Sequence, residues 1–324
     1  YDLIAVSNIG EVDADGELLS VFISDTVDAQ FLIAHPKLKL IATRSRSVDH
    51  IDVAECRARG VAICNVPHYA EESVAEHTFA LLLALSRRLR ELMTHPKEGH
   101  FSYAAVRCQE LCGKTMGIIG MGRVGQQVAS LAHAFQMTVI ASDIDRSPDV
   151  AKKQGFEWVS LDDLFARSDV ISLHAPLSPQ TYHVLNRETL AKTKRGVIII
   201  NTARGALIDT GALRDALESG QVGGAGLDVL QDERVLRQSA PEIISAEILR
   251  HLRSDALAQE AHDAERIRDL RELVLGEALL SRPNVVFTPH VAFNSVEAVA
   301  RLREVTAANL KAFIAGSPQN LVLA

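Results

Sequence analysis

Residues 113–125 read GKTMGIIGMGRVG, with glycines at positions 120, 122 and 125 between an apolar run and the segment VASLAHAF. Alone, the spacing G-x-G-x-x-G is a weak signal, because glycine turns in α/β proteins often serve packing only. Here a strand pattern (TMGII) precedes the glycines, a helix pattern follows them, and the next strand pattern, TVIAS, ends at Asp143. Such a unit presents backbone amides to a pyrophosphate and a carboxylate to a ribose hydroxyl. The stretch therefore predicts a dinucleotide-binding domain.

The predicted cofactor site begins with this motif and with the aspartate, in the set Gly120, Gly122, Arg123, Val124, Gly125 and Asp143. Asp143 and Asp145 would repel the 2′-phosphate of NADP, whereas Arg146 could favour it. NAD is therefore the expected cofactor.

Composition restricts the remaining possibilities. The chain has 324 residues, enough for about two domains, with 47% hydrophobic residues and a net charge of −7. We expect no nucleic-acid partner, because there is no basic patch, and no membrane partner, because no apolar run is long enough. The N-terminus lacks the cationic segment of a signal peptide, which favours the cytoplasm. The four cysteines form neither a disulfide framework nor a zinc motif, so we expect incidental thiols and no metal.

Short β-branched runs alternate with helical patterns, which predicts an α/β protein with parallel sheets. The expected strands are 19–23, 38–42 and 61–64 in a first unit, and 115–119, 138–142, 170–174, 196–201, 223–227 and 284–288 in a second.

Two helical segments stand out from this alternation. Ser73 and Glu76 have the spacing of a capping box, so we expect a buried apolar helix to begin there and to lie between two domains. Residues 240–282 carry dense charges of both signs. They predict a solvated helical excursion, with a dedicated interaction surface as the alternative.

Polar residues follow several expected strands of the second unit, and ligands of open parallel sheets bind at the carboxyl ends of strands. These residues, with one position farther along a loop, complete the predicted cofactor and catalytic sites: His174, Pro176, Thr181, Thr202, Ala203, Arg204, Asp228 and His290. An arginine, two histidines and an aspartate at one edge suit reversible hydride transfer to a 2-oxo acid.

Individual roles follow from side-chain chemistry. His290 is the candidate proton donor, because imidazole titrates near neutral pH. Arg204 offers a planar fork for a carboxylate and can polarise the adjacent carbonyl. A carboxylate beside the histidine would orient its ring and favour its protonated form. Spacing alone leaves Glu233, Asp228 and Asp232 as alternatives for that carboxylate.

The motifs NVPHYAEESVAEHT, INTARGALIDTGAL, GAGLDVLQDE and PNVVFTPHVAF, with the glycine motif, resemble the D-isomer-specific 2-hydroxyacid dehydrogenases, with most likeness to the D-lactate dehydrogenase branch. The resemblance runs from about residue 19 to the C-terminus, except 240–282. It implies that Arg204 binds the substrate carboxylate, that His290 is the acid/base, and that Glu233 is the partner of His290. It also implies that Asp228 and His174 line the nicotinamide and ribose, and that Tyr69 and Phe293 cover the substrate.

The same resemblance implies an α/β fold of two doubly wound parallel-sheet domains. A Rossmann-type cofactor domain at 74–292 is inserted into a flavodoxin-like substrate domain made of 1–73 and 293–324. Members of this family form homodimers mainly through the cofactor domain, so we expect a homodimer.

Two departures from the family pattern concern the substrate domain. The loop TRSRSVDHID has Ser47 where the family has a glycine, and serine lacks the freedom of glycine at positive φ. Arg46 precedes it; we expect this arginine to face solvent, with recognition of a second acidic group on a dicarboxylate or phosphorylated substrate as the alternative. Both residues are included in the predicted substrate site. The N-terminal stretch before residue 20 is also shorter than the strand and helix that the family has there.

The expected function is NAD-dependent reversible reduction of a small 2-oxo acid to the D-2-hydroxy acid, on the pattern of pyruvate and D-lactate. An NAD(H)-sensing, corepressor-like protein with little turnover is the competing hypothesis. The set Arg204, Glu233 and His290 favours the enzyme. Formate dehydrogenases pair the histidine with glutamine, so Glu233 counts against them. Many phosphoglycerate dehydrogenases carry a regulatory C-terminal domain, which we do not expect in a chain that ends at Ala324.

Overall fold

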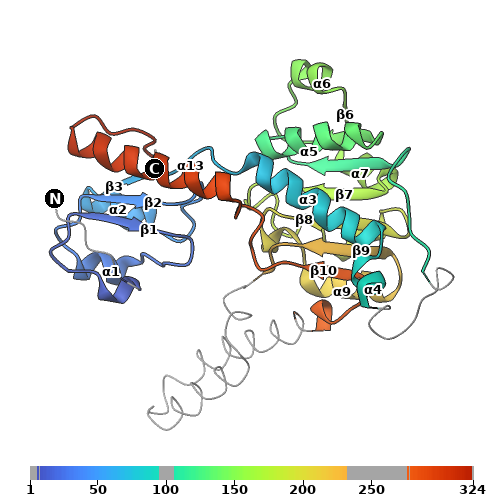
Figure 1. The fold of residues 1–324 in the computed structure, drawn as a ribbon, viewed down its shortest axis with the longest axis horizontal. Coiled ribbons are helices and arrows are strands. Elements are labelled where there is room, and N and C mark those ends of the chain that lie inside the picture. The colour runs from blue at the N-terminus through green and yellow to red at the C-terminus, as the bar shows by residue number, and fades with distance from the viewer. Residues whose placement is uncertain (1–5, 7, 95–105, 232–275, 277, 323–324) are drawn as a thin grey trace, which may run out of the picture. The chain divides into compact units, whose positions relative to one another are not determined.

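The computed structural model describes residues 6, 8–94, 106–231, 276 and 278–322 (Figure 1). The chain divides into two compact units, one made of residues 1–70 with 293–324 and the other of residues 71–292. The sequence places the first boundary after residue 73 and the second after residue 292. In the structure the boundaries follow Ala70 and Ala292.

The first unit is built on a parallel sheet in the order β1-β2-β3, formed by β1 (Leu18–Val21), β2 (Leu40–Thr43) and β3 (Ala62–Cys64). Side chains alternate across a strand, so the two faces of β2 bury different residues. Ile41 lies on one face, in the apolar cluster that includes α1 (Ala29–Ala34) and α2 (Val53–Arg59). Leu40 lies on the opposite face, in the cluster that includes the C-terminal helix α13 (Val296–Ile314). The C-terminal helix therefore packs on a sheet formed by N-terminal residues (Figure 1).

The second unit has seven parallel strands in the order β10-β9-β8-β7-β4-β5-β6. Their bounds are β4 (Thr115–Ile119), β5 (Thr138–Ser142), β6 (Glu157–Trp158), β7 (Val170–Leu173), β8 (Val197–Asn201), β9 (Val222–Leu227) and β10 (Val285–Phe287). The order reverses between β4 and β7. That switch point is where open α/β sheets bind their ligands.

Helices cover both faces of this sheet (Figure 1). Ile198 and Ile200 of β8 belong to the apolar cluster that includes α3 (Glu71–Ser86) and α5 (Arg123–Ala134). Val197 and Ile199 belong to the opposite cluster, with α7 (Leu161–Arg167), α8 (Arg187–Ala191) and α9 (Thr210–Glu218). Burial on both faces explains why this strand is a continuous apolar run. The described residues of the unit also include the short elements α4 (Leu89–Thr94), α6 (Pro148–Gln154) and the 3₁₀ turn Gly205–Leu207.

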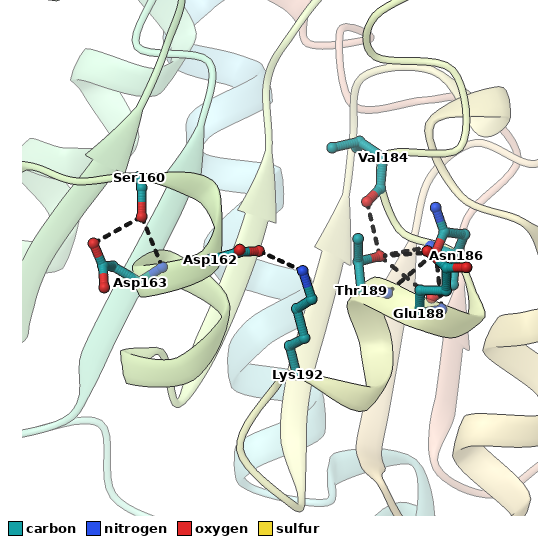
Figure 2. Close-up of polar contacts among 8 residues, drawn as sticks. All are labelled: Ser160, Asp162, Asp163, Val184, Asn186, Glu188, Thr189 and Lys192. Carbon is teal, nitrogen blue, oxygen red and sulfur yellow. Dashed lines mark hydrogen bonds and ion pairs between the residues drawn. The ribbon is translucent and has the colours of Figure 1, made fainter.

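Side chains next to the helices fix where α7 and α8 begin (Figure 2). The hydroxyl of Ser160 accepts a hydrogen bond from the backbone N–H of Asp163 at 3.0 Å, which caps α7. Asn186 and Thr189 form a capping box at the start of α8. Lys192 bonds Asp162 at 2.7 Å on the exposed surface, where such pairs contribute little to stability. The helix boundaries on this face are therefore set by local sequence.

The predicted start of the apolar helix is wrong. Helix α3 begins at Glu71, so Ser73 lies inside its first turn. The helix is also buried on one side only, since Glu72 and Ala80 are exposed, and it packs within the second unit against α5 and β8–β10. Strand β6 was not predicted, because two residues carry no period. Most of 240–282 lies outside the described residues.

Two cysteines are buried, as predicted for incidental thiols. Burial raises the pKa of the Cys56 and Cys64 thiols to about 11, which leaves them protonated and unreactive near neutral pH. Within the described ranges no helix is both long and apolar enough to cross a membrane.

Candidate functional site

The glycine motif forms the turn between β4 and α5, at the switch point of the sheet. Gly120 has φ +93°, and a Cβ there would lie 2.4 Å from the backbone nitrogen of Ala175, in the loop after β7. A Cβ on Gly125 would lie 2.3 Å from the carbonyl oxygen of Gly120. Both positions require glycine, because the opposing atoms are backbone and cannot move aside.

Gly122 has a different reason to be glycine. It is the N-cap of α5, with no side-chain cap, and no atom of the described residues lies within 4 Å of where its Cβ would be. Packing therefore does not require a glycine here, whereas close approach of a phosphate to the first amides of α5 would. The neighbouring Arg123 is exposed, and its Nη1 lies 4.0 Å from Oε1 of Glu71. Val124 is partly buried in the first turn of α5.

Asp143 follows β5 and is tied to the glycine turn. Its Oδ2 accepts from the backbone N–H of Met121 at 2.6 Å, and its Oδ1 accepts from that of Asp145 at 3.2 Å. Arg146 donates to the carbonyl oxygen of Asp143 rather than to its carboxylate. Ile144 is 99% exposed next to this carboxylate, a feature that the sequence reading missed. The carboxylate thus bonds an amide inside the glycine turn, which places it next to the expected pyrophosphate site, where a ribose ligand is needed.

The loop after β7 is shaped by its own side chains. His174 lies with its Nε2 2.8 Å from the hydroxyl of Ser172, and burial lowers its pKa to about 3, so the ring is neutral at physiological pH. The hydroxyl of Thr181 donates to the carbonyl of Pro176 at 2.7 Å and accepts from the amide of Ser178 at 2.8 Å. Thr181 therefore fastens the turn that presents Pro176, which is exposed.

Arg204 lies in a turn after β8 that buried groups hold in place. The side chain of Asn201, 0% exposed, donates to the carbonyl of Arg204 at 2.9 Å and accepts from the amide of Ala203 at 3.0 Å. Thr202 bonds Thr78 of α3 through hydroxyl groups 3.0 Å apart, so its side chain joins helix to strand. Half-buried Arg204 is thereby carried on a rigid turn.

His290 stands in the loop after β10, with a left-handed backbone at φ +56°. Such a conformation is uncommon for a residue other than glycine and costs about 1 kcal/mol or more. The backbone N–H of His290 donates to the carbonyl of Asp228 at 2.8 Å. The Asp228 side chain, 1% exposed, accepts from the hydroxyl of Thr288 at 2.6 Å and from the amides of Val291 and Ala292, both at 2.9 Å.

These contacts change the interpretation of Asp228. Both of its carboxylate oxygens accept hydrogen bonds from the loop that carries His290, so its main visible role is to hold that loop. Asp232 and Glu233, the other candidate partners of the histidine, lie outside the described residues.

Two of the predicted substrate residues, Tyr69 and Phe293, form a row of aromatic rings with Phe22 in the first unit. Phe293 lies 5.6 Å from Phe22 and 6.4 Å from Tyr69, ring centroid to ring centroid. Arg44 lies 5.8 Å from the ring of Phe22. Phe22 was missed because the predicted strand 19–23 contained it, whereas β1 ends at Val21 and leaves Phe22 just past the strand.

The loop after β2 that contains Arg46 and Ser47 is braced from both sides. The buried hydroxyl of Ser45 donates to the carbonyl of Ser47 at 2.5 Å, and the side chain of Asn65 donates to the carbonyl of Arg46 at 2.7 Å. Neither Arg46 nor Ser47 is in the left-handed region. Serine therefore fits the backbone here without strain. The side chain of Arg46 is exposed, as expected.

Comparison with known proteins agrees with this geometry. A family model described as D-isomer specific 2-hydroxyacid dehydrogenase, NAD binding domain, matches residues 79–292. A crystal structure of D-lactate dehydrogenase from Aquifex aeolicus, complexed with NAD and lactic acid, is 36% identical and covers 96% of this chain and 87% of that one, with a TM-score of 0.78.

Relatives of known sequence have several activities in their names. D-3-phosphoglycerate dehydrogenase of Mycobacterium bovis is 40% identical over 84% of this chain and 52% of its own length. Glyoxylate reductase of Korarchaeum cryptofilum is 35% identical over 95% of this chain and 83% of its own length. The chain thus spans about half the length of the phosphoglycerate dehydrogenases it matches. The glycine turn and the matched domain together establish NAD as the cofactor.

Proposed function

Because the chain belongs to the D-isomer specific 2-hydroxyacid dehydrogenases, a family of NAD-dependent oxidoreductases, we propose that it reduces a small 2-oxo acid reversibly to the D-2-hydroxy acid. One observation carries this proposal. Five neighbouring strands, β10-β9-β8-β7-β4, place their chemical groups on one edge of the sheet. In that order the groups are His290, Asp228, Arg204, His174 and the glycine turn.

The proposed roles follow from what each group can do. Bound NADH supplies the hydride. Arg204 binds the substrate carboxylate through its planar fork and polarises the neighbouring carbonyl. His290 gives a proton to the carbonyl oxygen as it becomes a hydroxyl, and takes it back in the reverse direction. Glu233 is proposed to orient the imidazole of His290, as the family resemblance implies.

For NAD we propose that the first amides of α5, at Gly122 and Arg123, hold the pyrophosphate, with Val124 and Gly125 forming the helix turn behind them. Asp143 binds the adenine ribose, and exposed Ile144 offers an apolar surface to the adjoining adenine. Pro176, Thr181, Thr202 and Ala203 shape the two loops near the nicotinamide, while His174 and Asp228 support it from inside the protein.

The ribose assignment can be tested at Asp143. In Asp143→Ala we expect NADH to bind about tenfold more weakly, because the ribose loses an acceptor and the Met121 amide loses its partner. The affinity for NADPH should fall less than that for NADH, or rise, because the repulsion between Asp143 and the 2′-phosphate disappears. Fluorescence titration with both cofactors measures the ratio, and Asp162→Ala, which removes an exposed carboxylate of α7 that pairs with Lys192, is the control. An unchanged ratio would mean that the ribose is recognised elsewhere.

For the substrate we propose a small monocarboxylic 2-oxo acid such as pyruvate. Support comes from the aromatic row of Phe22, Phe293 and Tyr69 in the first unit, which suits an apolar substituent, and from the similarity to D-lactate dehydrogenase. Arg46 supports a second candidate. It lies on a braced loop, and relatives include phosphoglycerate dehydrogenases, so its guanidinium is the group of the first unit that would pair with a second acidic group of a substrate.

A substrate panel separates these candidates. NADH oxidation is followed with pyruvate, phenylpyruvate, 2-oxoisocaproate, glyoxylate, hydroxypyruvate, its phosphate ester and oxaloacetate. Fast turnover of a monocarboxylate that Arg46→Ala leaves intact supports the first candidate. A preference for oxaloacetate or the phosphate ester that Arg46→Ala removes supports the second. Tight NADH binding with no turnover of any acid would favour the NAD-sensing protein instead.

The remaining expectations concern assembly and location. We propose that the chain forms a homodimer and acts in the cytoplasm. Light scattering of the purified protein measures the first of these directly.

A further inference from the structure

His77 of α3 lies beside the loop that carries His290, although no step of the proposed reaction uses it. Its Nε2 is 2.8 Å from the hydroxyl oxygen of Thr288 and 3.5 Å from Oδ1 of Asp228. The imidazole is partly buried, with 22% of the side chain exposed. The contact joins a helix to a loop more than 200 residues away in the sequence, so local sequence does not explain it.

The directions of these hydrogen bonds follow from counting hydrogens. Both oxygens of Asp228 already accept from the amides of Val291 and Ala292, which can only donate. The carboxylate is therefore an acceptor, and the Thr288 hydroxyl donates its single hydrogen to it. That hydroxyl oxygen can then only accept from His77. Nε2 of His77 must carry a hydrogen, and the chain runs from His77 through Thr288 to Asp228.

This chain bears on His290 through the backbone. Thr288 lies two residues before His290, and Val291 and Ala292 follow it, so Asp228 binds the loop on both sides of the proposed acid. His290 itself has a left-handed backbone, which persists only where surrounding contacts enforce it. His77 fixes the hydroxyl of Thr288 in the one orientation that serves Asp228.

We propose that His77 is a positioning residue for His290. Its Nε2–H orients the Thr288 hydroxyl toward Asp228. Asp228 then holds the loop at 288–292 so that the imidazole of His290 is correctly placed to protonate the substrate carbonyl. The inference rests on the proposed function where the test measures turnover.

Four variants test the proposal by steady-state kinetics with the preferred 2-oxo acid. His77→Leu removes the donor, His77→Gln replaces it with an amide N–H at a similar reach, and Thr288→Val removes the hydroxyl at nearly constant shape. The fourth variant combines His77→Leu with Thr288→Val. His133→Leu is the matched control, since His133 lies on α5 in the same unit and bonds the carbonyl of Gln154.

We expect His77→Leu to lower kcat by about tenfold to a hundredfold, the range for a misplaced catalytic group, with little change in KM or NADH affinity. His77→Gln should recover most of the loss, which a merely space-filling role would not allow. The double variant should be no slower than the slower single variant within about twofold, because both changes break one chain. Wild-type turnover in His77→Leu, equal losses in the Leu and Gln variants, or additive losses would each overturn the proposal.

A second measurement does not depend on turnover. In protein labelled with ¹⁵N-histidine, the His77 ring should carry hydrogen on Nε2, and the His290 resonances should shift in His77→Leu but not in His133→Leu. A His77 ring with hydrogen only on Nδ1, or an unmoved His290 signal, would overturn the inference. Should the wild type reduce no 2-oxo acid, the proposed function fails, and these spectra still decide whether His77 positions His290.

Discussion

Replacing His290 with alanine is expected to lower kcat by about a hundredfold to ten-thousandfold, the contribution of a positioned general acid. Without His290, only water is left to protonate the alkoxide that develops as the carbonyl is reduced. The proposed cofactor residues lie mainly on other loops. NADH should therefore bind as in the wild type. Stopped-flow turnover and NADH fluorescence titration measure the two effects separately.

The backbone at His290 makes the choice of control important. Because this residue has φ +56°, alanine keeps the strain of a left-handed backbone without the imidazole. Asparagine adopts that conformation more readily, so His290→Asn removes the acid while keeping the loop. Both variants should lose turnover to a similar extent. If His290→Asn retains wild-type kcat, His290 is not the acid.

Replacing Gly205 with alanine is expected to have the largest effect on stability. A Cβ at this position would lie 1.9 Å from the carbonyl carbon and 2.1 Å from the carbonyl oxygen of Leu230. Backbone cannot rotate away as a side chain can, so the turn after β8 must move. We expect a loss of about 2–3 kcal/mol in the free energy of unfolding, at the upper end of the usual overpacking cost. Kcat should also fall, because Arg204 is the preceding residue.

The matched control is Gly211→Ala, in the first turn of α9. There a Cβ would meet only the carboxylate oxygen of Asp209, at 3.4 Å, and alanine favours helix over glycine by up to about 1 kcal/mol. Thermal unfolding should show a lower Tm for Gly205→Ala and an equal or higher Tm for Gly211→Ala. A Gly205→Ala protein that melts and turns over like wild type would contradict the packing argument.

The sequence predicted the class of fold well because its signals are local. A strand buried on both faces must be apolar throughout, as VIIIN is, and a phosphate turn needs glycines at fixed spacing. Strand ends of a parallel sheet share one edge, which was enough to select Arg204, Asp228 and His290 together. The family model over residues 79–292 confirms the family and the cofactor.

The predictions that were wrong or missed also have physical causes. Ser73 has the spacing of a capping box, but α3 begins two residues earlier, at Glu71, where it packs on the sheet of the second unit. Phe22 and Ile144 have no motif, and their positions only become informative once neighbouring rings or solvent are seen.

The residues at strand ends and glycine turns could be identified from the sequence alone, because these positions depend on spacing along the chain and on the backbone freedom of single residues. The hydrogen-bond partners of those residues became known only from the folded chain. Asp228 was selected as a residue at a strand end, and the structure adds that its carboxylate holds a loop that follows it by about 60 residues. His77 was part of a helix pattern, yet its Nε2 meets that same loop. A hydrogen bond requires two atoms within about 3 Å in a suitable direction, and only folding brings such distant partners together.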